Sequence, residues 1–256
     1  MTLALLRLDV RAGLRERKIW FAAAIYVYTL LAVPLLLLKP PPHVAAAMTA
    51  FFGDQDPFTF FMYVWTDLAM NKVVAMLGVV LAAGVVLRER DTRVLPLLAS
   101  KPISMPRYFV VRATSACLVT AALYITTQLI AVPVFMARVP GFRAGEFLAA
   151  GLLHVWAAMF ATALAATLTV IVGRRGPGLL LSLIVIMTLV GMAFLGFYNP
   201  AWRNVALLNP FALGVEAVGH LGALGPGVLL PPMLGLAAIC AVTIAVGAFA
   251  VRRLEV

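Results

Sequence analysis

Residues 147–172 read FLAAGLLHVWAAMFATALAATLTVIV, and His154 is the single ionisable side chain in this run. A helix needs about 20 mostly apolar residues to cross the hydrocarbon core of a bilayer, because its backbone polar groups must be satisfied within the segment. The run is therefore long enough to span a membrane. The next six residues, 173–178, read GRRGPG, which predicts a helix-breaking hairpin turn.

Five further apolar runs flank this one, and the chain as a whole is 64% hydrophobic and 12% charged. Soluble domains carry about 25% charged residues. The six runs predict an all-α polytopic membrane protein with six transmembrane helices, at roughly 19–38, 68–87, 109–136, 147–172, 179–197 and 228–251. Although the net charge is +10, the basic residues fall between the apolar runs and form no single basic surface, which excludes a nucleic-acid partner.

The basic residues also predict the topology. Fifteen Lys and Arg residues lie in 1–18, 88–112, 174–175 and 252–253, against five at 39, 72, 138, 143 and 203. Because short cytoplasmic loops retain Lys and Arg, both termini are predicted to be cytoplasmic. The expected location is the inner (plasma) membrane of a bacterium, with Tyr63 and Trp65 as aromatic anchors at the outer interface.

Residues 1–18 have two faces at helical spacing and predict a cytoplasmic amphipathic elbow helix before a transmembrane domain at 19–256. The apolar face consists of Leu3, Leu6, Val10 and Leu14, and the basic face of Arg7, Arg11, Arg15 and Lys18. Such a helix lies in the inner interface and is attracted to anionic lipid. The alternative is that it also contacts a cytoplasmic partner.

The loop after the second run, residues 88–108, reads RERDTRVLPLLASKPISMPRY. Its charged start, apolar middle and X-Pro stop predict a short helix at about 89–105. The apolar residues either dip into lipid or fill a groove on a soluble partner, with the flanking charges fixing orientation. The candidate partner-binding residues are Glu89, Asp91, Thr92, Val94, Leu95, Leu97, Leu98 and Lys101.

A segment before the last run, residues 206–220, reads ALLNPFALGVEAVGH. Asn209 and Pro210 start a helix too short to span, and Glu216 requires polar surroundings. The pattern predicts re-entrant half-helices at about 203–224 on the outer side, with Asn209, Pro210, Glu216 and His220 as site residues. Such backbone is tolerated at membrane depth only when protein buries it or it lines a cavity.

Both segments resemble type-2 ABC exporter permeases. The loop is similar to the family's Glu, Gly-Thr-Leu, Leu-rich turn and Ser-x-Pro followed by a basic residue, with matches at Glu89, Thr92, Leu95, Leu97, Leu98, Ser100, Pro102 and Arg107. Asp91 and Arg93 replace the usual Gly and Leu, and Pro96 interrupts the helix. The outer segment is similar to Asn-Pro-x-x-x-x-x-Glu-x-x-Arg, with His220 in the last place. The six-run layout resembles permeases that mature the copper sites of nitrous oxide reductase.

The resemblance implies that the loop is a coupling helix, seated in a groove of a separate ATPase subunit that binds ATP and Mg. It also implies a homodimer, or a pair with a relative, and allows an extracytoplasmic protein partner. The chain is not expected to be an enzyme, because it lacks a phosphate-binding Gly-x-x-x-x-Gly-Lys-Ser/Thr loop and a His-Glu-x-x-His motif. The alternatives are a gradient-driven secondary transporter and a non-transporting transmitter or anchor.

Four residues are candidates for a transport pathway: Asp67, Asn71, Lys72 and His154. Asp67 and Asn71 are expected on one helix face near the outer end of the second span, where the charged groups could equally reach water. His154 is either bonded to a neighbouring helix or part of a proton relay. No metal site is expected, because Cys117 and Cys240 are too few to build one.

Overall fold

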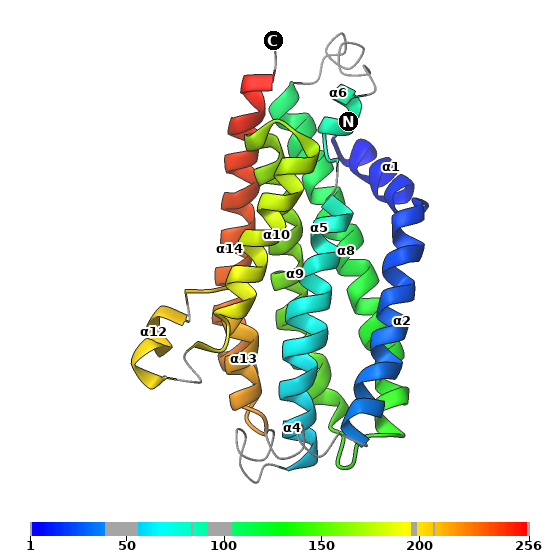
Figure 1. Ribbon diagram of the computed structural model, residues 1–256, viewed down its shortest axis with the longest axis vertical. Helices are drawn as coiled ribbons and strands as arrows, with labels where there is room; N and C mark the ends of the chain where they lie inside the picture. The colour runs from blue at the N-terminus through cyan, green and yellow to red at the C-terminus, as the bar shows by residue number, and fades with distance from the viewer. Residues whose placement is uncertain are drawn as a thin grey trace.

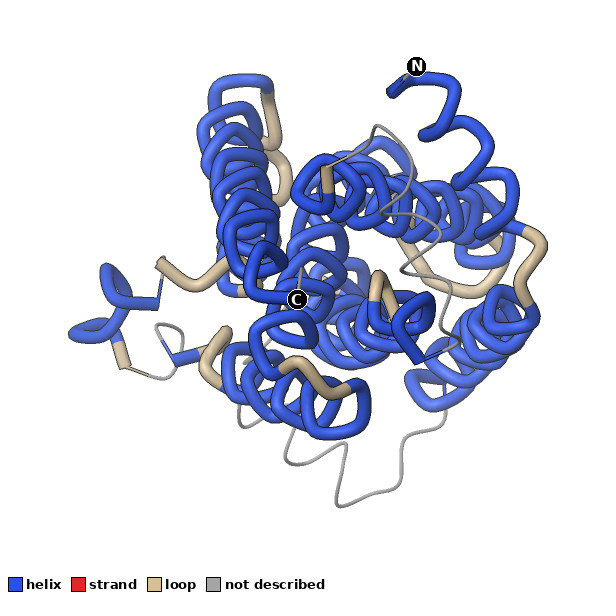
Figure 2. Tube along the Cα trace, turned by 90° about the horizontal axis from the view of Figure 1, so that it is seen from above, coloured by secondary structure: helices blue, strands red, loops and turns tan. Residues whose placement is uncertain are grey.

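The computed structural model describes residues 2–38, 56–82, 84–91, 104–195, 199–206 and 208–254. Viewed along its length (Figure 2), the described part consists of helices joined by loops and turns and contains no strand. Both chain ends lie at the same end of the bundle (Figure 1). We call this the arginine-rich end, because its segments carry Arg88, Arg90, Arg174, Arg175, Arg252 and Arg253.

Five stretches are long and apolar enough to cross a membrane: Arg17–Leu35, Pro57–Asp91, Met105–Met136, Ala144–Val172 and Pro226–Arg253. They contain the helices α2 (Arg17–Leu38), α4 (Pro57–Val64), η1 (Trp65–Val74), α5 (Ala75–Ala82), α8 (Met105–Met136), α9 (Ala144–Val172) and α14 (Pro226–Ala250). The prediction of an all-helical chain with several membrane-length helices is therefore confirmed for the described residues.

The fifth predicted span differs from its expectation. Helix α10 covers Arg175–Gly191, 17 residues, which at a rise of 1.5 Å per residue is about 25 Å, less than the ~30 Å hydrocarbon core. A count of six spans is thus not confirmed. The predicted hairpin at 173–178 is also too long: Gly173 makes the turn at φ +68°, and α10 begins two residues later. Pro177 fits there because the first turn of a helix tolerates proline.

The second membrane-length stretch begins earlier than predicted. Asp56 caps α4, its Oδ1 accepting hydrogen bonds from the backbone N–H groups of Phe58 at 3.0 Å and Thr59 at 3.1 Å. The chain continues without a break through η1, a ten-residue π-helix. Trp65 and Tyr63 are buried, so their predicted role as interface anchors is wrong. Trp65 packs edge-on against Phe135, with ring centroids 4.8 Å apart.

Helix α9 lies at the centre of the bundle and packs against α5, α8, α10 and α14. Its buried alanines allow this close approach; they include Ala157, Ala158, Ala161, Ala163, Ala165 and Ala166. Short helices occupy the two ends: α1 (Thr2–Leu14), α6 (Leu87–Asp91), η2 (Pro200–Trp202), α12 (Arg203–Ala206), α13 (Ala212–Gly219) and η3 (Val251–Leu254). Figure 1 shows α12 projecting from the bundle and α1 lying against its arginine-rich end.

Candidate functional site

The root of the predicted coupling helix lies in α6, at the arginine-rich end. Of the candidate partner-binding residues, Glu89 is half-buried and Asp91 is exposed in this helix. The others, Thr92, Val94, Leu95, Leu97, Leu98 and Lys101, lie outside the described residues. Among these candidates, the structure therefore describes only the first residues of the predicted coupling helix.

Glu89 belongs to a group of charged and polar side chains from three helices. We call this group the Arg112 cluster: Asp9, Glu89, Tyr108 and Arg112. Arg112 of α8 donates through Nη2 to Glu89 Oε1 of α6 at 2.8 Å. Its Nη1 donates to Asp9 Oδ1 of α1. The Tyr108 hydroxyl donates to Glu89 Oε1 at 3.2 Å. One guanidinium thus joins the first helix, the loop root and the third membrane-length helix.

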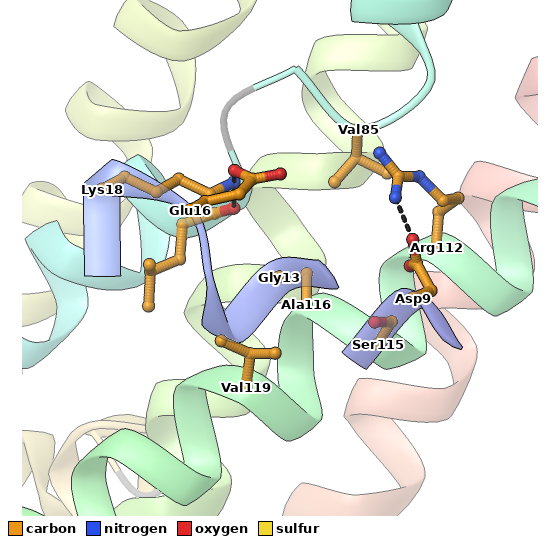
Figure 3. A pocket seen from close by; sticks show the side chains of 10 residues that line it. Asp9, Gly13, Glu16, Lys18, Val85, Arg112, Ser115, Ala116 and Val119 are labelled. Carbon is orange, nitrogen blue, oxygen red and sulfur yellow. Dashed lines mark hydrogen bonds and ion pairs between the residues drawn. The ribbon is translucent and has the colours of Figure 1, made fainter. Parts of the chain in front are cut away.

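A second set of contacts continues along the junction between α1 and α2. Glu16 pairs with Lys18 at 3.1 Å and with Arg88 at 3.5 Å, and Lys18 Nζ donates to the Leu81 carbonyl at 2.8 Å. Between the two sets lies a cavity of about 40 Å³, shown in Figure 3, whose walls come from α1, α2, α5, α8 and the turns at Glu16 and Val85. Its volume suits a small number of water molecules and no larger ligand.

The Arg112 cluster is more buried than an ordinary surface ion pair. The side chains of Arg112, Asp9 and Glu89 are only 22%, 16% and 14% exposed to solvent. Removing one partner from such a group leaves charges that the protein no longer pairs and that water reaches only in part, which destabilises a protein. The cluster therefore holds α1, α6 and α8 together as one unit. This arrangement can transmit movement, and it contains no nucleophile or general base aimed at a substrate.

Sequence reasoning missed Asp9, Tyr108 and Arg112 as a group. A signal for Arg112 was present, because it is the single charged residue within the run 109–136, and a charge inside a membrane helix requires a partner. Asp9 is the single acidic residue of α1. Their pairing depends on how α1 folds back onto α8, which spacing along the chain does not reveal.

Comparison with known protein families and with curated proteins finds no match for this chain. The assignment of function therefore depends on the residues themselves.

The predicted outer segment contains α13, a helix of eight residues too short to span a membrane. Asn209 and Pro210 are buried before it. Asn209 Nδ2 donates to the Leu189 carbonyl at 2.5 Å, and its Oδ1 accepts from the Phe211 N–H at 3.1 Å. Glu216 is half-buried, while His220 is exposed and lies 2.9 Å from the Glu216 carbonyl.

The four pathway candidates separate into two kinds. Asp67 and Lys72 pair at 2.7 Å with side chains 37% and 46% exposed, whereas Asn71 and His154 are buried. The expectation that Asp67 and Asn71 share a face assumed an α-helix; in the π-helix η1, Asp67 instead reaches the residue five positions on. His154 Nδ1 lies 3.0 Å from the Ala150 carbonyl of its own helix, so the expected bond to a neighbouring helix is not formed.

Proposed function

We propose that this chain is the membrane-spanning permease subunit of an ATP-binding-cassette exporter, acting as a homodimer at the inner membrane of a bacterium. A separate ATPase subunit would bind ATP and Mg and dock against the coupling helix at about 89–105. The exported solute would pass toward the extracytoplasmic side, where a further protein partner could receive it.

The observation that carries the proposal is the Arg112 cluster at the base of the coupling helix. Glu89 and Asp91 stand in α6, and Glu89 is held by Arg112 of α8, which also holds Asp9 of α1. A push on the loop would therefore move three helices together, as a rigid-body switch requires. A loop that only rested on lipid would have no need of such an attachment.

A gradient-driven mechanism has less support from the described residues. Proton- or sodium-coupled transporters place ionisable groups near the middle of the membrane. Among the described residues, His154 is the single ionisable side chain in the buried polar set, and no carboxylate accompanies it there.

The direct test is co-purification from the native membranes. We expect the double variant Leu95→Asp/Leu97→Asp to insert normally but to lose the co-purified, vanadate-sensitive ATP hydrolysis, because charge would not enter an apolar groove. Leu208→Asp is the control: it makes the same type of substitution, once, at a side chain that is 80% exposed near α13, and ATP hydrolysis should stay with the protein. Retention of the ATPase by the double variant would contradict the proposal, as would full transport by the chain reconstituted alone.

A further inference from the structure

Five buried side chains have polar atoms without a hydrogen-bond partner among the described residues: Trp65, Thr66, Asn71, Gln128 and His154. Three of the five carry an amide or an imidazole. Asn71 is 0% exposed, His154 2% and Gln128 4%. Neither amide atom of Asn71 has a partner, nor does Gln128 Oε1 or His154 Nε2. Unpaired buried polar groups destabilise a protein, and native structures retain few of them. We call Asn71, Gln128 and His154 the polar layer.

Helices α8 and α9 bring two members of the layer to the same level. A Cβ placed on Gly151 of α9 would lie 3.5 Å from Gln128 Oε1 of α8, so this oxygen points at the Gly151 backbone. His154 follows Gly151 by three residues, a spacing that puts both on one face of α9. The amide of Gln128 and the imidazole of His154 therefore lie along the same helix face.

The third member reaches this level through η1. The Tyr124 hydroxyl of α8 donates to the sulfur of Met70 at 3.1 Å, and Met70 is the neighbour of Asn71. Tyr124 precedes Gln128 by four residues, about one helical turn. The three residues thus stand at similar heights along the bundle, on three helices.

Helix α13 covers the His154 side of the layer. A Cβ on Gly214 would lie 2.1 Å from His154 Nε2, so α13 can approach this closely only because residue 214 is glycine. The two ends of α13 are tied down: Asn209 donates to the Leu189 carbonyl at 2.5 Å, and Glu146 Oε2 accepts from the Gly222 N–H at 2.9 Å. Displacing α13 would uncover His154 Nε2.

The chemistry of the layer selects the kind of molecule that fits it. The described buried polar side chains are Thr, Ser, Asn, Gln and His, with no carboxylate, ammonium or guanidinium. A charged ligand would be desolvated there without a counter-charge. Amide groups both donate and accept hydrogen bonds, and a neutral imidazole does the same.

We infer that the polar layer is a binding site for a small uncharged solute that carries both hydrogen-bond donors and acceptors, such as an amide or a polyol, and that α13 is its cover. The inference deepens the proposed export function by naming a solute class. It rests on that function only for the direction in which the solute moves.

The test measures access to the layer in the chain without any ATPase. Asn71→Cys is introduced into a Cys117→Ser/Cys240→Ser background, and the purified protein in lipid vesicles is treated with a small methanethiosulfonate reagent. We expect the introduced thiol to react slowly and acetamide or glycerol to slow it further. Adding Gly214→Ala should raise the rate about tenfold, the factor by which a clash of ~1.4 kcal/mol shifts a closed cover toward its open state.

Gly219→Ala is the matched control on the same helix, because its Cβ would meet only the Tyr63 hydroxyl, at 4.0 Å; it should leave the rate unchanged. Glu146→Ala removes the acceptor for the Gly222 N–H and so releases the other tie of α13; it should act like Gly214→Ala if that variant folds poorly. If neither variant raises the rate of thiol modification, α13 does not cover the layer. A reaction that neither acetamide nor glycerol slows overturns the solute site and leaves ordinary buried water. None of these readouts depends on the co-purification result, so the two proposals can fail separately.

Discussion

Arg112 and the polar layer both place polar groups inside an apolar bundle, but they do so in different ways. At the arginine-rich end, the guanidinium of Arg112 has a carboxylate on each of two other helices. In the bundle interior, Asn71 is fully buried and has no hydrogen-bond partner for either amide atom among the described residues. The first arrangement fixes helices relative to one another, whereas the second leaves hydrogen-bonding capacity unused.

The same contrast appears along a single helix, α14. A Cβ on Gly247, near the arginine-rich end, would lie 2.4 Å from the ring of Phe109, while one on Gly235 would meet nothing within 4 Å. Close contact and ion pairing thus coincide at the arginine-rich end. The opposite half has ion pairs of its own, from Arg143 to Asp56 and Glu146, but there Gly235 is exposed, and we expect conformational change to occur there, at the short helix α13.

The largest effect is expected from breaking the Arg112 cluster. Arg112→Met leaves the carboxylates of Asp9 and Glu89 half-buried without their cation, and we expect a loss of about 3 kcal/mol, at the lower end for a buried pair because solvent still reaches the site. Thermal unfolding of the purified protein in detergent measures it. Arg112→Lys keeps the charge and should lose less. Equal stability of the Met variant and the parent would show that the cluster does not hold the three helices.

A smaller loss is expected from Gly247→Ala. The added methyl must displace Phe109 or the helix backbone, and overpacking of this kind costs about 2 kcal/mol. Gly235→Ala on the same helix should be neutral or stabilising, by up to ~1 kcal/mol, because alanine favours the helix. Equal melting temperatures for the two variants would remove the contrast between the halves of α14.

Asp56→Ala should lower the free energy of unfolding by about 1 kcal/mol, because the first turn of α4 loses its hydrogen-bond acceptor. Thermal unfolding in detergent measures this loss. The Thr59 hydroxyl, donating to the carboxylate, lowers the pKa of Asp56 below its ordinary 3.8. Because the pKa of Asp56 is lower in the folded than in the unfolded protein, the carboxylate contributes its full stabilisation above pH 3.8. That stabilisation is lost as the pH falls through the pKa of the folded protein. Asp56→Asn retains an acceptor and should remove this acid dependence; an unchanged acid profile would contradict the assignment.

The smallest effect is expected at the Asp67–Lys72 pair. Both side chains are more than a third exposed, so Asp67→Asn should change stability by at most about 0.5 kcal/mol. Added salt should reduce even this difference. A loss comparable to that of Arg112→Met would mean that exposure does not separate the two ion pairs.

The sequence predicted the long helices well, because uninterrupted apolar runs leave the backbone no alternative in a membrane. Helices α2, α8, α9 and α14 begin within a few residues of their predicted starts. The beginning of the second stretch was missed: the predicted span starts at 68, whereas α4 begins at Pro57. In fact α4 continues into η1, and tertiary burial of Phe61 and Trp65 stabilises this part.

The candidate sites were predicted less completely. Glu89 and Asn209 were recognised from a resemblance, but their partners Arg112 and Leu189 lie 23 and 20 residues away, and only the fold brings them together. The burial of Asn71 depends on the π-helical winding of η1. A prediction that assumes an α-helix puts this side chain on the wrong face. The close approach of His154 to Gly214 has no signal in the spacing of either segment.

The turn at Gly173 and Arg174 has a geometric consequence. Two residues join α9 to α10, and Arg90 Nη1 donates to the Gly173 carbonyl at 3.0 Å, so the two helices cannot separate at this point. They can only tilt apart about this turn as a hinge, and the displacement is then largest at the far end of α10, at Gly191. For a lever of about 25 Å, a tilt of ~10° moves that tip by ~4 Å. Through Asn209 and Leu189, the same swing would pull the start of α13 away from the bundle.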